Sequence, residues 1–204
     1  MNYSEPVELV PQHMLSQVTE MPTTMKNVII LHGTGDSPKL YWIPYLAKNL
    51  KNKGYRVWAP QLPNAKKPNI EDWLSFILKY GKFNKDTVLV GHSAGAQLIL
   101  SILENITVKI DKAVLVSGYA KPLPRKTGFK KRDKFNWSKI RKHVKNLFYI
   151  NSDNDPWGCT DRQGRIMFDK LGGTLVIVHE GHMGSSTYKQ PYKKFPLLLK
   201  LIAD

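Results

Sequence analysis

The chain of 204 residues carries 31 Lys and Arg against 16 Asp and Glu, for a net charge of +15, and 42% of its residues are hydrophobic. This length suffices for one domain with a substantial buried core. The single cysteine, Cys159, excludes an internal disulfide, and no apolar run reaches the roughly 18 residues needed to span a bilayer. Residues 1–26 do not combine a basic segment with an apolar one, so we expect no secretory signal and a cytoplasmic protein.

The positive charge raises the question of nucleic-acid binding. The basic residues are 25 Lys and only 6 Arg, whereas bidentate contacts with bases and phosphates favour Arg. A solvated surface therefore explains the charge better than a nucleic-acid partner does. We expect neither a nucleic acid nor a membrane to be the main partner.

The first part of the chain reads as an extension followed by alternating strands and helices. Polar residues 1–25 contain three prolines and are expected to form an extension, partly disordered, before a domain of residues 26–204. The β-branched apolar run 27–31 predicts a buried parallel strand. Helical spacing of apolar residues predicts a helix over 40–53, which Gly54 ends. Next come a strand over 55–59, a helix over 70–80 and a strand that begins at 87.

The most specific motif is Gly91-His92-Ser93-Ala94-Gly95, which matches the G-x-S-x-G nucleophile elbow. A strand that turns abruptly into a helix holds the serine in a strained backbone conformation, with its hydroxyl above the sheet edge. Side chains at the flanking positions would collide with the neighbouring strand and helix, so glycine is required at both. An apolar strand before the motif and a helical run over 94–104 after it indicate more than a chance match. The sequence therefore predicts Ser93 as a nucleophile.

The alternation continues to the end of the chain. A strand over 112–117 is followed by an irregular, basic insertion over 118–135. The remaining predicted elements are a helix over 136–143, a strand over 147–151, a helix over 161–171, a strand over 174–179 and a helix over 196–202. Six strands alternating with helices predict a single α/β domain, in which helices cover both faces of a parallel sheet.

Polar residues follow four of these strands, at the sheet edge where open α/β folds form their sites. A serine hydroxyl needs a base to take its proton, and that base needs a carboxylate to hold its tautomer. The chain supplies Ser, Asp and His in the order typical of α/β-hydrolases. His182 is the preferred base because it lies beyond Gly181 on a loop, whereas His179 still belongs to a strand pattern.

Two aspartates follow the fifth strand, and either can serve as the carboxylate. Asp155 is preferred because Pro156 would fix its orientation, while Asp153 is expected to bond within the turn. A metal pair of His179 and His182 is not favoured because no third ligand is evident. We expect no metal and no cofactor.

The tetrahedral intermediate of acyl transfer needs two preorganised N–H donors, an oxyanion hole. Ala94, directly after the nucleophile, is expected to supply one, and Thr34, in the glycine-containing loop after the first strand, the other. His32 is expected to support that loop without transferring a proton. Further residues expected around the substrate pocket are Gly33, Trp157, Met183 and His92, which either lines the pocket or packs beneath it.

Several segments together resemble the small serine hydrolases grouped with retinoblastoma-binding protein 9, within the α/β-hydrolase superfamily. The segments are Gly-His-Ser-Ala-Gly at 91–95, Leu-Val-Ser-Gly-Tyr at 115–119, Phe-Asn-Trp-Ser-Lys-Ile at 135–140, Ser-Asp-Asn-Asp-Pro-Trp at 152–157 and Gly-His at 181–182. The tryptophan-containing segment and the Asp-Pro-aromatic turn discriminate better than the elbow, which the whole superfamily shares. The resemblance covers about residues 26 to 204. It implies Ser93, Asp155 and His182 as a catalytic triad, on a fold without a large cap domain.

The expected function is that of an esterase-like serine hydrolase, which cleaves a small carboxylic ester, amide or thioester through an acyl-enzyme. One alternative is a binding protein on a hydrolase fold with weak catalysis. Another is the binding of acidic partners by the insertion 118–135, which carries seven basic residues and one acid. A solvated loop is the simpler interpretation of that segment.

Overall fold

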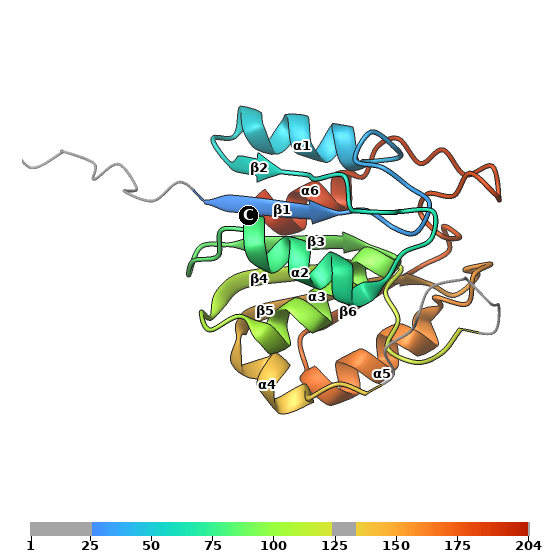
Figure 1. The fold of residues 1–204 in the computed structure, drawn as a ribbon. Helices are drawn as coiled ribbons and strands as arrows, with labels where there is room; N and C mark the ends of the chain where they lie inside the picture. Colours follow the sequence, from blue (N-terminus) through green and yellow to red (C-terminus); the bar gives the residue numbers. More distant parts are fainter. Residues whose placement is uncertain (1–25, 124–133, 204) are drawn as a thin grey trace, which may run out of the picture.

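The computed structural model describes residues 26–123 and 134–203, which fold around one sheet of parallel strands in the order β2-β1-β3-β4-β5-β6 (Figure 1). The strands are β1 (Asn27–Leu31), β2 (Arg56–Trp58), β3 (Val88–His92), β4 (Ile110–Val116), β5 (Val144–Ser152) and β6 (Thr174–Val178). The helices are α1 (Ile43–Asn52), α2 (Ile70–Tyr80), α3 (Ala94–Asn105), α4 (Trp137–Lys142), α5 (Asp161–Leu171) and α6 (Pro196–Ala203). The predicted α/β architecture is confirmed. The N-terminal extension and part of the basic insertion lie outside the described residues.

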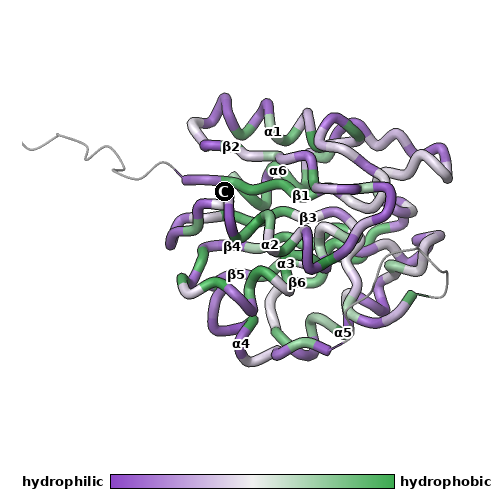
Figure 2. The backbone as a smooth tube through the Cα atoms, viewed as in Figure 1, coloured by the Kyte–Doolittle hydropathy of each residue, from purple (hydrophilic) through white to green (hydrophobic). Residues whose placement is uncertain are grey.

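The central strands are apolar on both faces because helices cover both faces of the sheet. In β1, Val28 and Ile30 join the apolar cluster formed with α1 and α6, whereas Ile29 and Leu31 join the cluster formed with the other helices. This division follows from the alternation of side chains along a strand. Figure 2 shows the apolar strands in the interior of the molecule and hydrophilic stretches on the outer helices.

Two elements begin three residues away from their predicted starts, and the other boundaries differ from the prediction by at most two residues. Helix α1 begins at Ile43 rather than at residue 40, because Tyr41 has a positive φ of 53° and Trp42 occupies the N-cap position. Strand β5 begins at Val144, three residues earlier than predicted, because Val144 already pairs with Ile110 of β4. Polar residues at the start of β5 break the apolar pattern that defined the predicted strand.

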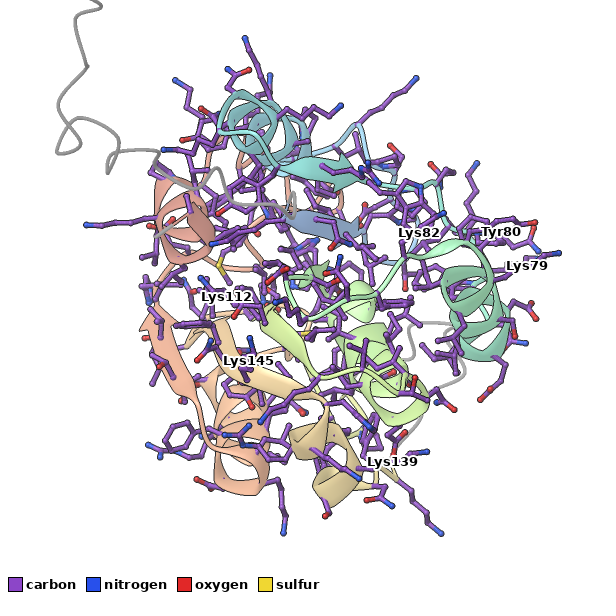
Figure 3. All side chains as sticks on the ribbon, turned by 90° about the vertical axis from the view of Figure 1, so that its left-hand side faces the viewer. Lys79, Tyr80, Lys82, Lys112, Lys139 and Lys145 are labelled. Atoms are coloured by element: carbon purple, nitrogen blue, oxygen red, sulfur yellow. The ribbon has the colours of Figure 1, made fainter. Side chains whose placement is uncertain are left out.

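The parallel strands bring the loops that follow them to one end of the sheet, the right-hand side of Figure 1. Figure 3 shows the opposite, amino end of the strands, where Lys82, Lys139 and Lys145 point into solvent. This distribution agrees with the expectation that the excess charge lies on a solvated surface. No helix among the described residues is long and apolar enough to cross a membrane.

Candidate active site

Ser93 lies at the junction of β3 and α3, in the strained conformation expected of a nucleophile elbow. Its φ is 55° and its ψ is −118°, and its backbone N–H donates to Val116 O at 2.9 Å. A Cβ on Gly91 would lie 2.5 Å from Gly95 O, and one on Gly95 would collide with Leu31 O. Both glycines are therefore required by lack of space, and the turn fixes Ser93 above the sheet edge.

His182 and Asp155 form a buried pair beside this turn. The imidazole Nδ1 donates to Asp155 Oδ2 at 2.7 Å, and the side chains of His182 and Asp155 are 7% and 0% exposed. The other carboxylate oxygen accepts the backbone N–H of Trp157 at 2.8 Å. With one oxygen held by this N–H, Asp155 fixes both the orientation and the tautomer of the ring, which leaves Nε2 as an acceptor.

The backbone of His182 is anchored as firmly as its ring. Its carbonyl oxygen accepts hydrogen bonds from His92 Nε2 at 2.9 Å and from Ser117 Oγ at 3.0 Å. Its N–H donates to Gln190 Oε1 at 2.9 Å. Burial, with a smaller contribution from the neighbouring His182, lowers the pKa of His92 to about 3, so His92 stays neutral while it donates.

Asp153, the alternative carboxylate, bonds elsewhere. Its Oδ1 accepts from His179 Nδ1 at 2.7 Å, and both side chains are more than half exposed. The structure thus brings Asp155 to His182, and pairs Asp153 with His179 on the surface.

The loop after β1 is held in place by His32. Its Nδ1 donates to Gly33 O at 2.8 Å, while Nε2 accepts the backbone N–H of Leu62 at 2.9 Å. Burial lowers the pKa of His32, in keeping with a neutral ring. Gly35 N–H also donates to Ala65 O at 2.7 Å. These bonds agree with the supporting role expected of His32, and they hold Thr34 at the site.

Ser93 and His182 line the same cavity, whose volume is about 210 Å³. Thr34 and Trp157, two of the other residues expected at the site, also line it. The remaining lining residues are Gly35, Asp36, Tyr41, Tyr119, Leu123 and residues 184–187.

Three residues expected around the pocket lie outside this lining. His92 is only 1% exposed and packs beneath the site, where it holds the His182 carbonyl. Met183 is fully buried in the apolar cluster with α1 and α6. Gly33 lies behind the cavity wall, where a Cβ would come 3.2 Å from Ser93 Cβ.

Comparison with known proteins assigns the family. The model of the serine hydrolase family matches residues 28–203. The chain belongs to this family. Serine hydrolase RBBP9 of Rattus norvegicus is 27% identical over 177 residues, which cover 83% of this chain and 93% of that protein. YdeN of Bacillus subtilis (strain 168) is 37% identical over 102 residues, which cover 48% of this hydrolase and only 54% of YdeN.

Solved structures agree with this assignment. The structure of the ydeN gene product from B. subtilis superposes on the hydrolase with a TM-score of 0.81 at 28% identity, covering 87% of this chain and 97% of the other. Est1E from Butyrivibrio proteoclasticus, solved with ferulic acid bound, gives a TM-score of 0.63 at 13% identity and covers 89% and 88% of the two chains. The second likeness shows the α/β fold alone.

Seven side chains that line the cavity of the hydrolase were not predicted as site residues from the sequence: Asp36, Tyr41, Tyr119, Leu123, Ser185, Ser186 and Thr187. Tyr119 and Leu123 begin the insertion 118–135, which was interpreted as a solvated loop, but they are 2% and 7% exposed and pack with Cys159 and Trp157. The solvated-loop interpretation is therefore wrong for Tyr119 and Leu123, whose apolar side chains were the available signal. Residues 124–133, which hold most of the charge, lie outside the described part.

Potential metal donors of the described residues also gather here. Ligand atoms of Asp155, Cys159 and His182 lie within 4.8 Å of one another. Two of these donors already bond each other at 2.7 Å, and a metal ion would have to break that pair. We assign no metal to this group.

Proposed function

We propose that this hydrolase cleaves small carboxylic esters, amides or thioesters through an acyl-enzyme, with Ser93 as nucleophile, His182 as base and Asp155 as the orienting carboxylate. One observation carries the proposal. A serine in a strained strand–helix turn and a histidine held by a buried aspartate line the same cavity. Together these three features support covalent catalysis by Ser93.

In the proposed reaction, Ser93 Oγ attacks the substrate carbonyl carbon while its proton passes to His182 Nε2. Asp155 stabilises the imidazolium through the Nδ1–H bond and keeps its own charge. The carbonyl oxygen becomes an oxyanion in the tetrahedral intermediate. Collapse of this intermediate breaks the bond to the leaving group, which takes the proton from Nε2. A water molecule, deprotonated in the same way by His182, then releases the acid and regenerates Ser93.

The developing negative charge needs hydrogen-bond donors in fixed positions. Ala94 is the first residue of α3, and the first four N–H groups of a helix have no partner within it. We assign one donor to the Ala94 N–H and the other to the Thr34 N–H, since Thr34 lines the same cavity as Ser93. The positive end of the α3 dipole adds to the stabilisation.

The volume and the apolar lining of the cavity favour a substrate with a small acyl group. Its volume of about 210 Å³ is below the range of roughly 300–1,000 Å³ typical of pockets for drug-sized ligands. Tyr119, Leu123 and Trp157 give it apolar surface.

A cytoplasmic location stays a prediction from the sequence.

The test combines covalent labelling with turnover. Purified protein is treated with a fluorophosphonate probe and assayed on p-nitrophenyl butanoate, a butanoyl thioester and a butanoyl anilide. Ser93→Ala should abolish labelling and lower turnover by about 10³-fold or more with the fold retained by circular dichroism. Ser138→Ala, an exposed serine on α4, is the matched control and should behave as wild type. Undiminished labelling of Ser93→Ala would overturn the proposal, and a wild-type protein inert to probe and substrates would favour the binding-protein alternative.

A further inference from the structure

An acidic side chain that the triad does not use lines the same cavity. Asp36 belongs to the loop after β1, and its side chain is only 15% exposed. Tyr41 OH donates to Oδ1 at 3.0 Å, and Oδ2 lies 4.0 Å from His92 Nδ1. No Lys or Arg within residues 26–123 and 134–203 forms an ion pair with this carboxylate.

His92 does not neutralise the charge of Asp36. Its Nε2–H is used by the carbonyl of His182, and its pKa is lowered to about 3, so the ring turns an unprotonated Nδ1 toward Asp36. Burial also raises the pKa of Asp36, although Tyr41 and His182 partly offset that effect. A half-enclosed carboxylate without a cation is costly, and an incoming cation would repay that cost.

The carboxylate also lies close to the nucleophile. Asp36 Oδ2 and Ser93 Cβ approach the same point above Gly33, at 2.9 Å and 3.2 Å from the position that a Cβ there would occupy. A group that contacts Oδ2 therefore sits a few bonds away from a carbonyl attacked by Ser93. At this range an ammonium group on the acyl part of a substrate can reach the carboxylate.

The side chain of Asp36 is held in a fixed orientation by its neighbours. The hydroxyl of Tyr41 that binds it accepts the backbone N–H of Ser186 at 3.0 Å and lies 3.0 Å from Ser186 Oγ. The ring of Tyr41 packs against Gly184, where a Cβ would lie 2.6 Å from the ring. The carboxylate is thus preorganised by residues far apart in the sequence, as recognition of a charged group requires.

We propose that Asp36 binds a protonated amine on the acyl part of the substrate, so that the hydrolase prefers aminoacyl esters and amides to neutral ones of the same shape. The inference rests on the proposed function and names its substrate class. No Lys or Arg is among the described residues that line the cavity, so no permanently charged cation there offsets this negative charge.

The test compares two 4-methylumbelliferyl esters, those of 3-aminopropanoate and butanoate. They share length and shape and differ only in a terminal ammonium or methyl group. At pH 7 the ratio of their kcat/KM values, each corrected for spontaneous hydrolysis, should favour the amino ester at least tenfold. Asp36→Asn keeps an acceptor for Tyr41 but removes the charge, and should lower this ratio about tenfold while the butanoate rate changes far less. The control is Asp153→Asn, which removes an exposed carboxylate from the same end of the sheet.

A binding measurement separates this inference from the proposed function. Calorimetry on Ser93→Ala with the anilides of 3-aminopropanoate and butanoate needs no turnover, and the amino compound should bind about tenfold more tightly. That difference should vanish in Ser93→Ala combined with Asp36→Asn. Equal affinities in Ser93→Ala, or a kcat/KM ratio unchanged by Asp36→Asn, would overturn the role of Asp36. If Asp36→Asn fails to fold, the wild-type ratio and the Ser93→Ala affinities still decide. Binding selectivity without hydrolysis of either ester would refute the proposed function alone.

Discussion

The charged and titratable side chains at the two ends of the sheet differ in their burial and in their bonding partners. At the carboxyl end, His92, Asp155 and His182 are nearly buried and bonded to one another. At the amino end, the charged side chains of Lys82, Lys139 and Lys145 point into solvent (Figure 3), and other cations line a hollow. That hollow is lined by Lys109, Trp137, Ser138, Arg141, Lys142 and Lys170. Polar side chains are fixed by hydrogen bonds at the amino end too, as between Thr87 and Asn27, but at the carboxyl end a buried acid and a buried base bond each other beside a cavity. Enclosure and fixed partners, rather than charge density, identify the site.

The largest expected effect tests the pairing at the carboxyl end. Asp155→Asn should lower kcat by about 10⁴-fold, because an amide in place of the carboxylate no longer selects the tautomer that leaves Nε2 free. Asp153→Asn should change kcat by less than about threefold, since Asp153 pairs only with exposed His179. Steady-state kinetics of the two folded variants on one ester provide the measurement. The opposite ranking would transfer the orienting role to Asp153.

Replacing one glycine by alanine at each end of the sheet compares how tightly the backbone is packed there. Gly95→Ala at the carboxyl end should cost about 3 kcal/mol of unfolding free energy, because the new methyl group would collide with backbone carbonyls of the β1 end. Gly54→Ala at the amino end meets no atom within 4 Å, and only the positive φ of 83° opposes it. Its expected cost is about 1 kcal/mol. Urea unfolding of both variants measures the difference, and equal losses would refute the claim of unequal crowding.

Buried His92, at the carboxyl end of the sheet, should make the free energy of unfolding depend on pH. Above about pH 6.5 His92 is neutral in both the folded and the unfolded chain. Between that pH and its folded pKa of about 3, the unfolded chain binds a proton that the native protein excludes. The free energy of unfolding should therefore fall as pH falls, by up to about 1.4 kcal/mol per pH unit. Urea titrations at pH 7 and pH 5 should show a smaller drop for His92→Gln. A drop of equal size would assign the dependence to other groups.

The smallest effect is expected at the amino end. Replacing Lys139, Lys142 and Lys145 together by Gln should leave kcat/KM for a neutral ester within about twofold, because these exposed side chains lie on α4 and the start of β5, at the opposite end of the strands from Ser93. Unfolding free energy should change by only a few tenths of a kcal/mol, from the last turn of α4. A tenfold loss of kcat/KM would show that charge at this end acts on the reaction after all.

The sequence was most informative where a local pattern also decides the tertiary structure. The limits predicted for β1, α2 and α5 are confirmed, because their apolar periodicity and end signals coincide with their packing. The elbow is equally local, since Gly91 and Gly95 are required by contacts that any such turn makes.

The remainder of the site depends on contacts that no local pattern specifies. Tyr41 was assigned to a helix, but its positive φ turns it toward Ser186, 145 positions away. In the sequence Asp36 is an ordinary acidic loop residue, and only the contact between Tyr41 and Ser186 shows that its carboxylate is held in place. Likewise, the role of His92 became visible only with its partner 90 positions away.

The bond between His92 and the His182 carbonyl has a consequence for protein engineering. His92, at the first variable position of the G-x-S-x-G motif, links the turn that carries the nucleophile to the loop that carries the base. The positions of Ser93 and His182 therefore depend on each other. Because the acceptor is a backbone carbonyl, a loop of residues 179–190 taken from a relative keeps this bond if its backbone places that carbonyl at the same point. Such chimeras should therefore retain His92, and libraries that vary position 92 should keep a donor that reaches the carbonyl.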